Sequence, residues 1–242
     1  MRLIRPLAVV VLLAGFASAQ MPEKFTNLQV FPKDIQKEKL MAIMRNFSFS
    51  LGIRCDYCHA ETADHKMDFA ADDKDEKKTA RVMLRMVQSI NADYIKKLGA
   101  QPVEVRCVTC HRGIPIPQPI NEVLMATVQK KDVNAAIAQY KDLKSKYYGG
   151  AAYDFTETPM NQLAEALLDE HRGKDAVAIM EMNIAEHPKL NQRNAGWTYS
   201  VMAKAHLEAG EKDNAKADLQ QVLQADPNNK WAKGELEKLS RL

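Results

Sequence analysis

The sequence contains four cysteines, and all of them belong to two copies of one pattern, Cys-x-x-Cys-His. The two copies are formed by Cys55, Cys58 and His59 and by Cys107, Cys110 and His111. Two thiols three positions apart, with a histidine directly after the second, are typical of covalent haem attachment. The thiols form thioethers with the haem vinyl groups, and the histidine becomes an axial ligand of the iron. The pattern therefore predicts two covalently bound haem c groups.

Other uses of these cysteines fit less well. A zinc site joins two Cys-x-x-Cys pairs that are separated by about 12–20 residues, whereas 48 residues separate Cys58 from Cys107. A thioredoxin-like redox site needs one such pair near a βαβ pattern. A disulfide at this spacing would close a small, strained loop. Haem attachment explains the histidines and also removes all four thiols from disulfide chemistry.

The N-terminus has the pattern of an export signal. Two arginines, Arg2 and Arg5, precede the apolar residues 7–16 and the small residues 17–19, so we expect cleavage after Ala19 and a periplasmic or otherwise exported protein. The apolar run is shorter than the roughly 20 residues that span a bilayer, and no membrane span is expected after cleavage. Without the two arginines, 32 basic residues balance 31 acidic ones, which gives no basis for binding nucleic acid.

Each motif follows a predicted amphipathic helix. Apolar residues recurring at three and four positions predict a helix over 35–49 that ends near Gly52, directly before the first motif. A second helix is predicted through 77–98 and ends at Gly99. One face of it carries Val82, Met83, Met86, Val87, Ile90, Tyr94 and Leu98. The polar residues from 60 to 80 are expected to form a surface loop.

The second half contains no cysteine and shows an internal repeat, because residues 161–188 and 199–227 align with each other. Each copy has a helix with a small residue, a turn with glycine, a helix opening on alanine and a closing proline. These positions are Ala164 and Ala203, Gly173 and Gly210, Ala176 and Ala215, and Pro188 and Pro227. The pattern resembles the tetratricopeptide repeat, with a degenerate first unit within 123–143 and an insertion at 189–197.

These observations predict a mostly α fold with two domains after the signal peptide of residues 1–19. A small dihaem cytochrome c domain, in which a helix and a Cys-x-x-Cys-His motif are duplicated, is expected over 20–118. An α-helical tetratricopeptide-like repeat domain is expected over 119–242. The proline-rich residues 114–120 are interpreted as a stiff linker between them.

The second axial ligand of each iron is expected to be histidine or methionine. The histidines outside the motifs are His65 in the charged loop and His171, His187 and His206 in the repeat half, where a structural or exposed role is expected. Met41, Met44, Met83 and Met86 lie on the apolar faces of the two helices that precede the motifs. Methionine ordinarily fills space in a core, but a helix against a haem face would offer a sulfur there.

The segments "MRNFSFSLGIRCDYCH", "TARVMLRMVQSIN" and "VRCVTCHRG" resemble the cytochrome c subunit of photosynthetic reaction centres, over residues 28–118. The repeating unit of that family is a helix with the methionine ligand, a turn and then Cys-x-x-Cys-His. The resemblance implies that Met44 ligates the first iron and Met83 the second, with Met41 and Met86 as alternatives. That subunit carries four haems and this chain has two motifs, so the resemblance does not establish a photosystem as the partner.

The expected function is that of an exported dihaem c-type cytochrome, not an enzyme, which carries single electrons between redox partner proteins. The repeat domain would be its docking surface, since stacked helix pairs present a concave groove. Two alternatives stay open: a dihaem peroxidase or reductase with one open haem site, and a haem-bearing scaffold or sensor. Arg112, directly after the second motif, is either paired with a haem propionate or solvated.

Overall fold

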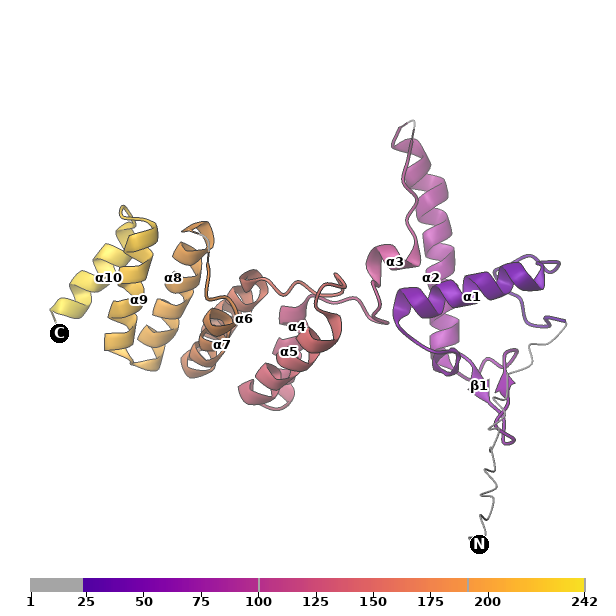
Figure 1. Cartoon of the computed structure of the whole chain (residues 1–242), viewed down its shortest axis with the longest axis horizontal. Coiled ribbons are helices and arrows are strands. Elements are labelled where there is room, and N and C mark those ends of the chain that lie inside the picture. The colour runs from indigo at the N-terminus through magenta and orange to yellow at the C-terminus, as the bar shows by residue number, and fades with distance from the viewer. Residues whose placement is uncertain (1–23, 100, 191, 242) are drawn as a thin grey trace, which may run out of the picture. The chain divides into compact units, whose positions relative to one another are not determined.

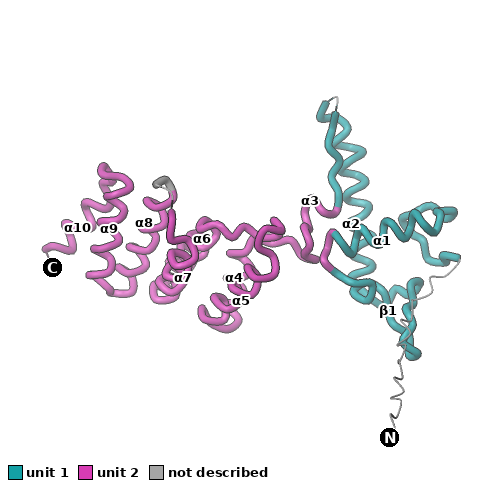
Figure 2. Tube along the Cα trace, viewed as in Figure 1, with its two compact units in different colours: residues 1–49, 53–106 teal, residues 50–52, 107–242 magenta. Residues whose placement is uncertain are grey.

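The computed structural model describes residues 24–99, 101–190 and 192–241. It is mostly helical, as predicted (Figure 1), and the signal peptide predicted for residues 1–19 lies outside the described residues. The chain divides into two compact units (Figure 2): Met1–Phe49 with Ile53–Arg106, and Ser50–Gly52 with Cys107–Leu242. Among the described residues, no helix is both long enough and apolar enough to cross a membrane.

Unit 1 contains both helices that were expected to precede the motifs. Helix α1 covers Lys37–Leu51, and α2 covers Asp75–Ser89 and continues through the π-helical turn η2 (Ile90–Tyr94) and the 3-10 turn η3 (Ile95–Lys97). The remaining elements are the 3-10 turn η1 (Cys55–Tyr57) and the strands β1 (Ala60–Glu61) and β2 (Met67–Asp68). The strands pair antiparallel, with Ala60 opposite Asp68. The region predicted as a plain loop therefore contains a short hairpin.

Unit 2 is built mainly from pairs of helices. After the single turn α3 (Cys107–Cys110), the helices are α4 (Ile120–Lys130), α5 (Val133–Tyr147), α6 (Glu157–Asp169), α7 (Gly173–Glu186), α8 (Gln192–Ala209), α9 (Lys212–Ala225) and α10 (Lys230–Ser240). Helix α4 packs on α5, α6 on α7 and α8 on α9, while α4 also contacts α6 and α6 contacts α8. Each pair thus buries its apolar face against the next one, as in solenoid repeats.

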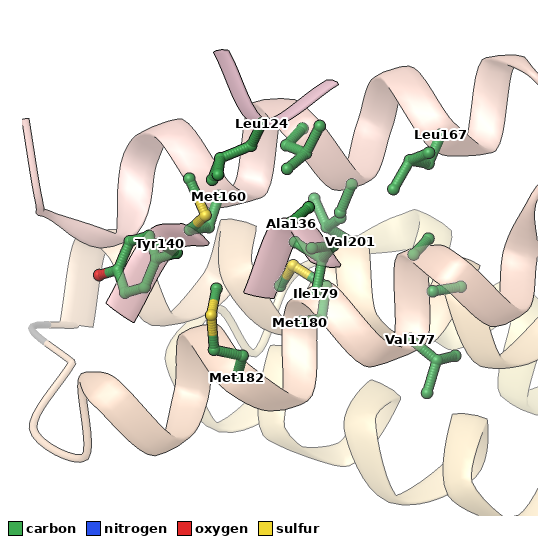
Figure 3. Packing of buried hydrophobic residues seen from close by; sticks show 14 of the residues in the cluster. Leu124, Ala136, Tyr140, Met160, Leu167, Val177, Ile179, Met180, Met182 and Val201 are labelled. Carbon is green, nitrogen blue, oxygen red and sulfur yellow. The ribbon is translucent and has the colours of Figure 1, made fainter. Parts of the chain in front are cut away.

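The repeat positions inferred from the sequence lie where helices pack most closely. The four alanines of the two aligned copies have no exposed surface: Ala164, Ala176, Ala203 and Ala215. Pro188 and Pro227 each follow the end of a helix, α7 and α9. Figure 3 shows Met160, Met180 and Met182 among the buried side chains of this core, so these methionines fill space, as the default for methionine predicts.

A chain of buried polar side chains crosses the core of the repeats. Asn161 donates a hydrogen bond to the Thr198 hydroxyl at 2.9 Å, and Asn183 donates to the Asn161 carbonyl oxygen at 2.9 Å. The ring Nδ1 of His187 lies 3.0 Å from the amide oxygen of Asn183, and its Nε2 lies 2.9 Å from the Phe155 carbonyl. Because buried polar groups are costly when unpaired, this network fixes α6, α7 and α8 in one register.

The structure adds detail to two expected connections. The proline-rich residues 114–120, interpreted as a stiff linker, belong to unit 2, where Ile114 is 3 % exposed and Ile120 only 1 %. Most of the insertion expected at 189–197 is helical, since α8 begins at Gln192. The domain boundary at 118 and 119 stays a prediction, and the compact unit that holds the repeats begins earlier, at Cys107.

Gly173 at the start of α7 allows a close approach of α8, which gives a stability prediction. A Cβ atom at this position would lie 2.9 Å from the Ala209 nitrogen and 2.9 Å from the Glu208 Cβ. We expect Gly173→Ala to destabilise unit 2 by about 1–3 kcal/mol, as overpacked sites generally do. Thermal unfolding followed by circular dichroism measures the change.

Gly234 in α10 is the matched control, because no atom lies within 4 Å of a Cβ added there. Gly234→Ala should stabilise the protein by about 0.5–1 kcal/mol, the usual gain from alanine in a helix interior. Equal melting temperatures for the two variants would contradict the close approach at Gly173.

Candidate haem sites

Both motifs form a single helical turn with the same backbone hydrogen bonds. In the first, the N–H groups of Cys58 and His59 donate to the Cys55 carbonyl, at 3.2 and 3.0 Å. In the second, the N–H group of His111 donates to the Cys107 carbonyl at 3.0 Å. Residues three and four positions apart share one side of such a turn, so each turn places its two sulfurs and its imidazole on one side.

The first motif faces a cavity in unit 1 of about 390 Å³. This volume lies within the range of about 300–1,000 Å³ that is usual for cofactor sites. The motif contributes Cys58 and His59 to its wall, and α1 contributes Leu40, Met44 and Phe47. The rest of the wall comes from residues 24–31, the β1–β2 region (Thr62, Met67, Asp68, Phe69, Ala70) and α2 (Lys77, Ala80, Arg81, Leu84).

His59 is held in this wall as a neutral ring. Its ring centroid lies 5.1 Å from that of Phe69, at an interplanar angle of 70°. Burial lowers the pKa of His59, and the nearby Lys77 cation lowers it further. Its Nδ1 is buried and has no hydrogen-bond partner among the described residues. Neutral imidazole is the form that ligates metals, so the site favours the protonation state that an axial ligand needs.

His111 of the second motif is oriented by a backbone contact. The ring is 9 % exposed, and its Nδ1 lies 3.1 Å from the Ile114 carbonyl oxygen. Since a carbonyl can only accept, Nδ1 carries the hydrogen of this contact, and Nε2 is the ring nitrogen that could bind a metal. A metal-binding histidine commonly donates its other N–H in this way.

The structure separates the candidate methionines. Met44 lines the cavity together with Cys58 and His59, whereas Met41 is not among the described residues of its wall. Met67 from β2 also lines it, although this methionine lies outside the two helices on which a ligand was expected. Met83 is partly buried on α2 in unit 1, Met86 is 42 % exposed, and His111 belongs to unit 2. The pairing of Met83 with the second iron therefore stays a prediction.

The histidines outside the motifs have other surroundings. His65 is exposed, with Nδ1 3.0 Å from a Glu61 carboxylate oxygen, and is not among the described residues that line the cavity. The side chain of His171 is exposed beside Glu208. His206 is buried, with Nδ1 2.6 Å from Asp218, which confirms its expected place at a repeat packing position.

The second motif borders an open hollow of about 480 Å³ in unit 2. Its lining includes Cys110, Arg112, Tyr153 and Gln162. The Arg112 guanidinium donates a hydrogen bond to the Ala151 carbonyl at 3.3 Å and is otherwise exposed. Its pairing with a haem propionate stays a prediction.

Lys77 is a buried cation in the wall of the first cavity, although the sequence placed it in a charged surface segment. Its ammonium group donates to the carbonyls of Phe69, Ala70 and Ala71 at 3.0, 3.0 and 2.5 Å. It also lies 3.2 Å from the carboxylate of Asp72. Lys77 thus fixes the segment whose Phe69 ring packs on His59.

Asp72 carries the counter-charge of this wall. Its carboxylate accepts a hydrogen bond from Arg81 at 2.7 Å. Hydrogen bonds, first from Arg81, hold the pKa of Asp72 well below its ordinary value. The carboxylate is therefore ionised at neutral pH, and the two cations of α2 share it.

A backbone contact in unit 2 joins the end of α1 to the chain after the second motif. The Gly113 N–H donates to the Ser50 carbonyl at 2.8 Å. Gly52 has φ +67°, and a Cβ there would lie 2.2 Å from the Gly113 oxygen. Only glycine fits, because both the left-handed backbone and the contact exclude a side chain. The sequence showed Gly52 as a helix end but not this second role.

The residues present fit a covalently bound haem. The cavity brings together a cysteine thiol, a neutral imidazole and thioether sulfurs, which are the groups that c-type haem uses. Burial raises the pKa of the Cys58 thiol and of the Cys107 thiol.

Comparison with known proteins agrees with a haem protein of this class. The family described as "Photosynthetic reaction centre cytochrome C subunit" matches residues 18–211, and the chain belongs to this family. The match is longer than the resemblance noted over 28–118 and includes residues of both units. Membership supports covalent haem c in this protein, whereas the number of two haems rests on the motif count.

Two curated relatives match the chain over part of its length. Cytochrome c-554 of Chloroflexus aurantiacus is 35 % identical over 104 residues, which are 42 % of this chain and 24 % of that protein. The photosynthetic reaction center cytochrome c subunit of Rubrivivax gelatinosus is 39 % identical over 66 residues, 27 % of this chain and 16 % of that protein. The chain thus spans no more than about a quarter of either relative.

One solved structure similar to part of the chain is the first tetratricopeptide repeat domain of Spaghetti, bound to an HSP90 peptide. It covers 50 % of this chain and 88 % of its own, at 22 % identity and a TM-score of 0.34.

The contacts of Lys77 give a prediction for unit 1. Lys77→Met keeps the length of the side chain but removes the ammonium donor from the carbonyls of Phe69 and Ala71, while the Ala70 carbonyl keeps a hydrogen bond from Asn27. We expect a loss of about 1–3 kcal/mol for buried acceptors left unpaired. Urea unfolding of the protein measures it.

Lys78→Met is the control, since Lys78 is exposed and its ammonium group pairs with Asp75 at the surface. Exposed pairs of this kind contribute about 0–1 kcal/mol. If both variants unfold at the same urea concentration, the buried role of Lys77 is wrong.

Proposed function

We propose that this protein is an exported dihaem c-type cytochrome that carries single electrons between redox partner proteins. Haem 1 would be attached to Cys55 and Cys58 and ligated by His59 and Met44. Haem 2 would be attached to Cys107 and Cys110 and ligated by His111 and Met83. The repeat half, residues 119–242, would serve as a docking surface.

The observation that carries the proposal is the cavity of unit 1. Met44 from α1 lines this cavity together with Cys58 and His59. The family's arrangement of a methionine-bearing helix before the motif would need this juxtaposition. Bound haem supplies the one-electron change of its iron, and the protein sets the potential through ligands and burial.

The residues around the first site have three roles. Cys55 and Cys58 would hold the haem covalently, so that it could not dissociate. His59 stays neutral through burial and the neighbouring Lys77 cation. Apolar side chains of α1, Leu40 and Phe47, exclude water from the cavity, which reduces the reorganisation that accompanies a change of charge.

The axial methionine is tested by replacing each sulfur of the cavity wall. Met44→Ala should remove the weak red methionine–iron band of one haem in the oxidised protein and lower the potential of that haem, since methionine ligation raises it. Met67→Ala is the matched control and should leave both unchanged. Loss of the band in the Met67 variant alone would assign the ligand to β2 and overturn the role of Met44.

The alternative of a peroxidase or reductase predicts one open iron. Carbon monoxide should then bind one haem of the reduced protein at neutral pH, whereas a carrier with both axial positions filled should bind none. Absorption spectra before and after addition of the gas distinguish the two functions. The scaffold or sensor alternative predicts that electron exchange with the redox partner is unchanged when residues 121–242 are deleted, whereas docking through the repeats predicts that it is lost.

A further inference from the structure

The side-chain amide of Asn91 holds the backbone of Val105, fourteen residues further along the chain. Its Nδ2 donates to the Val105 carbonyl at 2.8 Å, and the Val105 N–H donates to its Oδ1 at 2.8 Å. One amide thus makes both hydrogen bonds that a paired β-strand residue would make. Both residues are partly buried, so water competes less for these bonds than at a fully exposed site.

Asn91 lies in the π-helical turn η2, which continues α2. A π-helical turn contains an extra residue compared with an α-helical one and rotates the side chains that follow around the helix axis. Such turns are rare and are frequent at functional sites. The regular spacing of apolar residues in 77–98 gave no sign of it, because the sequence was interpreted as one continuous α-helix.

Chain geometry makes this contact relevant to the second motif. Val105 is two residues before Cys107, so the two can be separated by at most about 7 Å. Met83 is eight residues before Asn91, about 12 Å along a helix. Without the Asn91 contact, the sixteen residues from Asn91 to Cys107 could extend over about 55 Å. The contact between Asn91 and Val105 therefore limits how far Cys107, the first cysteine of the second motif, can move from the helix that carries Met83.

We propose that Asn91 is a positioning residue for the second haem. By holding Val105, it fixes the point from which the chain enters the second motif and limits how far Cys107 can move from the end of the helix that carries Met83. The proposal rests on the proposed function, because it concerns the haem of the second motif. It assigns a role to a residue outside both motifs and outside the set of axial ligands.

The test uses the full-length protein, exported and matured with haem, as Asn91→Ala, Asn91→Asp and Gln88→Ala variants. Gln88 is the matched control, since it is an exposed amide on the same helix. Intact mass gives the number of haems, spectroelectrochemistry gives the two potentials, and hydrogen exchange follows the Val105 amide. The first haem is an internal reference for correct folding.

We expect Asn91→Ala to raise the exchange rate of the Val105 amide at least about tenfold, since its acceptor is lost. Protein with a single haem should accumulate. In molecules that keep both haems, the reduction potential of one haem should fall, and the reduction potential of the other should be unchanged. Asn91→Asp should give a smaller effect, because its carboxylate still accepts from Val105 N–H but cannot donate to the carbonyl. Gln88→Ala should behave as the parent protein.

Two results would overturn the role of Asn91. One is a Val105 amide that exchanges as fast in the parent protein as in Asn91→Ala. The other is an Asn91→Ala protein that carries both haems with unchanged potentials although its Val105 amide has become exposed. A parent protein without covalent haem would instead overturn the proposed function. The haem content of the parent protein therefore distinguishes a failure of the proposed function from a failure of the role of Asn91.

Discussion

The arrangement of unit 1 depends on one buried ammonium group, that of Lys77. A charge removed from water is tolerated only when it is paired and hydrogen-bonded, and three carbonyls with the Asp72 carboxylate meet this demand. The same carbonyls lie in an irregular segment after β2 and need a donor of their own. The ammonium group and the carbonyls therefore stabilise each other. As a consequence, the Phe69 ring that packs on His59 is held in place. Helix α2 thus carries both this contact of the first site and Met83, the expected ligand of the second.

The two motifs are alike within one helical turn and differ beyond it. His59 lies in a cavity wall with a ring packed on its edge and a cation nearby, whereas His111 donates to the Ile114 carbonyl. Hydrogen bonding, burial and nearby charge all influence the potential of a haem iron. The surroundings therefore give the two motifs different electrostatic environments.

The repeat half is stabilised in another way. Alanines without exposed surface allow the helices to approach, and the hydrogen-bonded Asn161, Asn183 and Thr198 fix their register. Apolar packing alone would permit helices to slide by a turn with little loss, while a slipped polar network would leave buried groups unpaired. A stack of this kind is rigid enough to present one constant surface.

The sequence by itself determined the local features: the haem-binding turns, the helices before them, and the small residues and prolines of the repeats. These follow from spacings of three and four residues in the helices and of 37–39 residues between the repeats, which depend only on helix geometry and repeat length. Only the tertiary structure decided that Lys77 is buried, that Met67 shares the cavity with Met44, that Asn91 holds Val105 and that Gly52 meets Gly113. Each of these contacts joins segments that are distant in sequence, and a local sequence pattern does not predict which distant segment a side chain will contact.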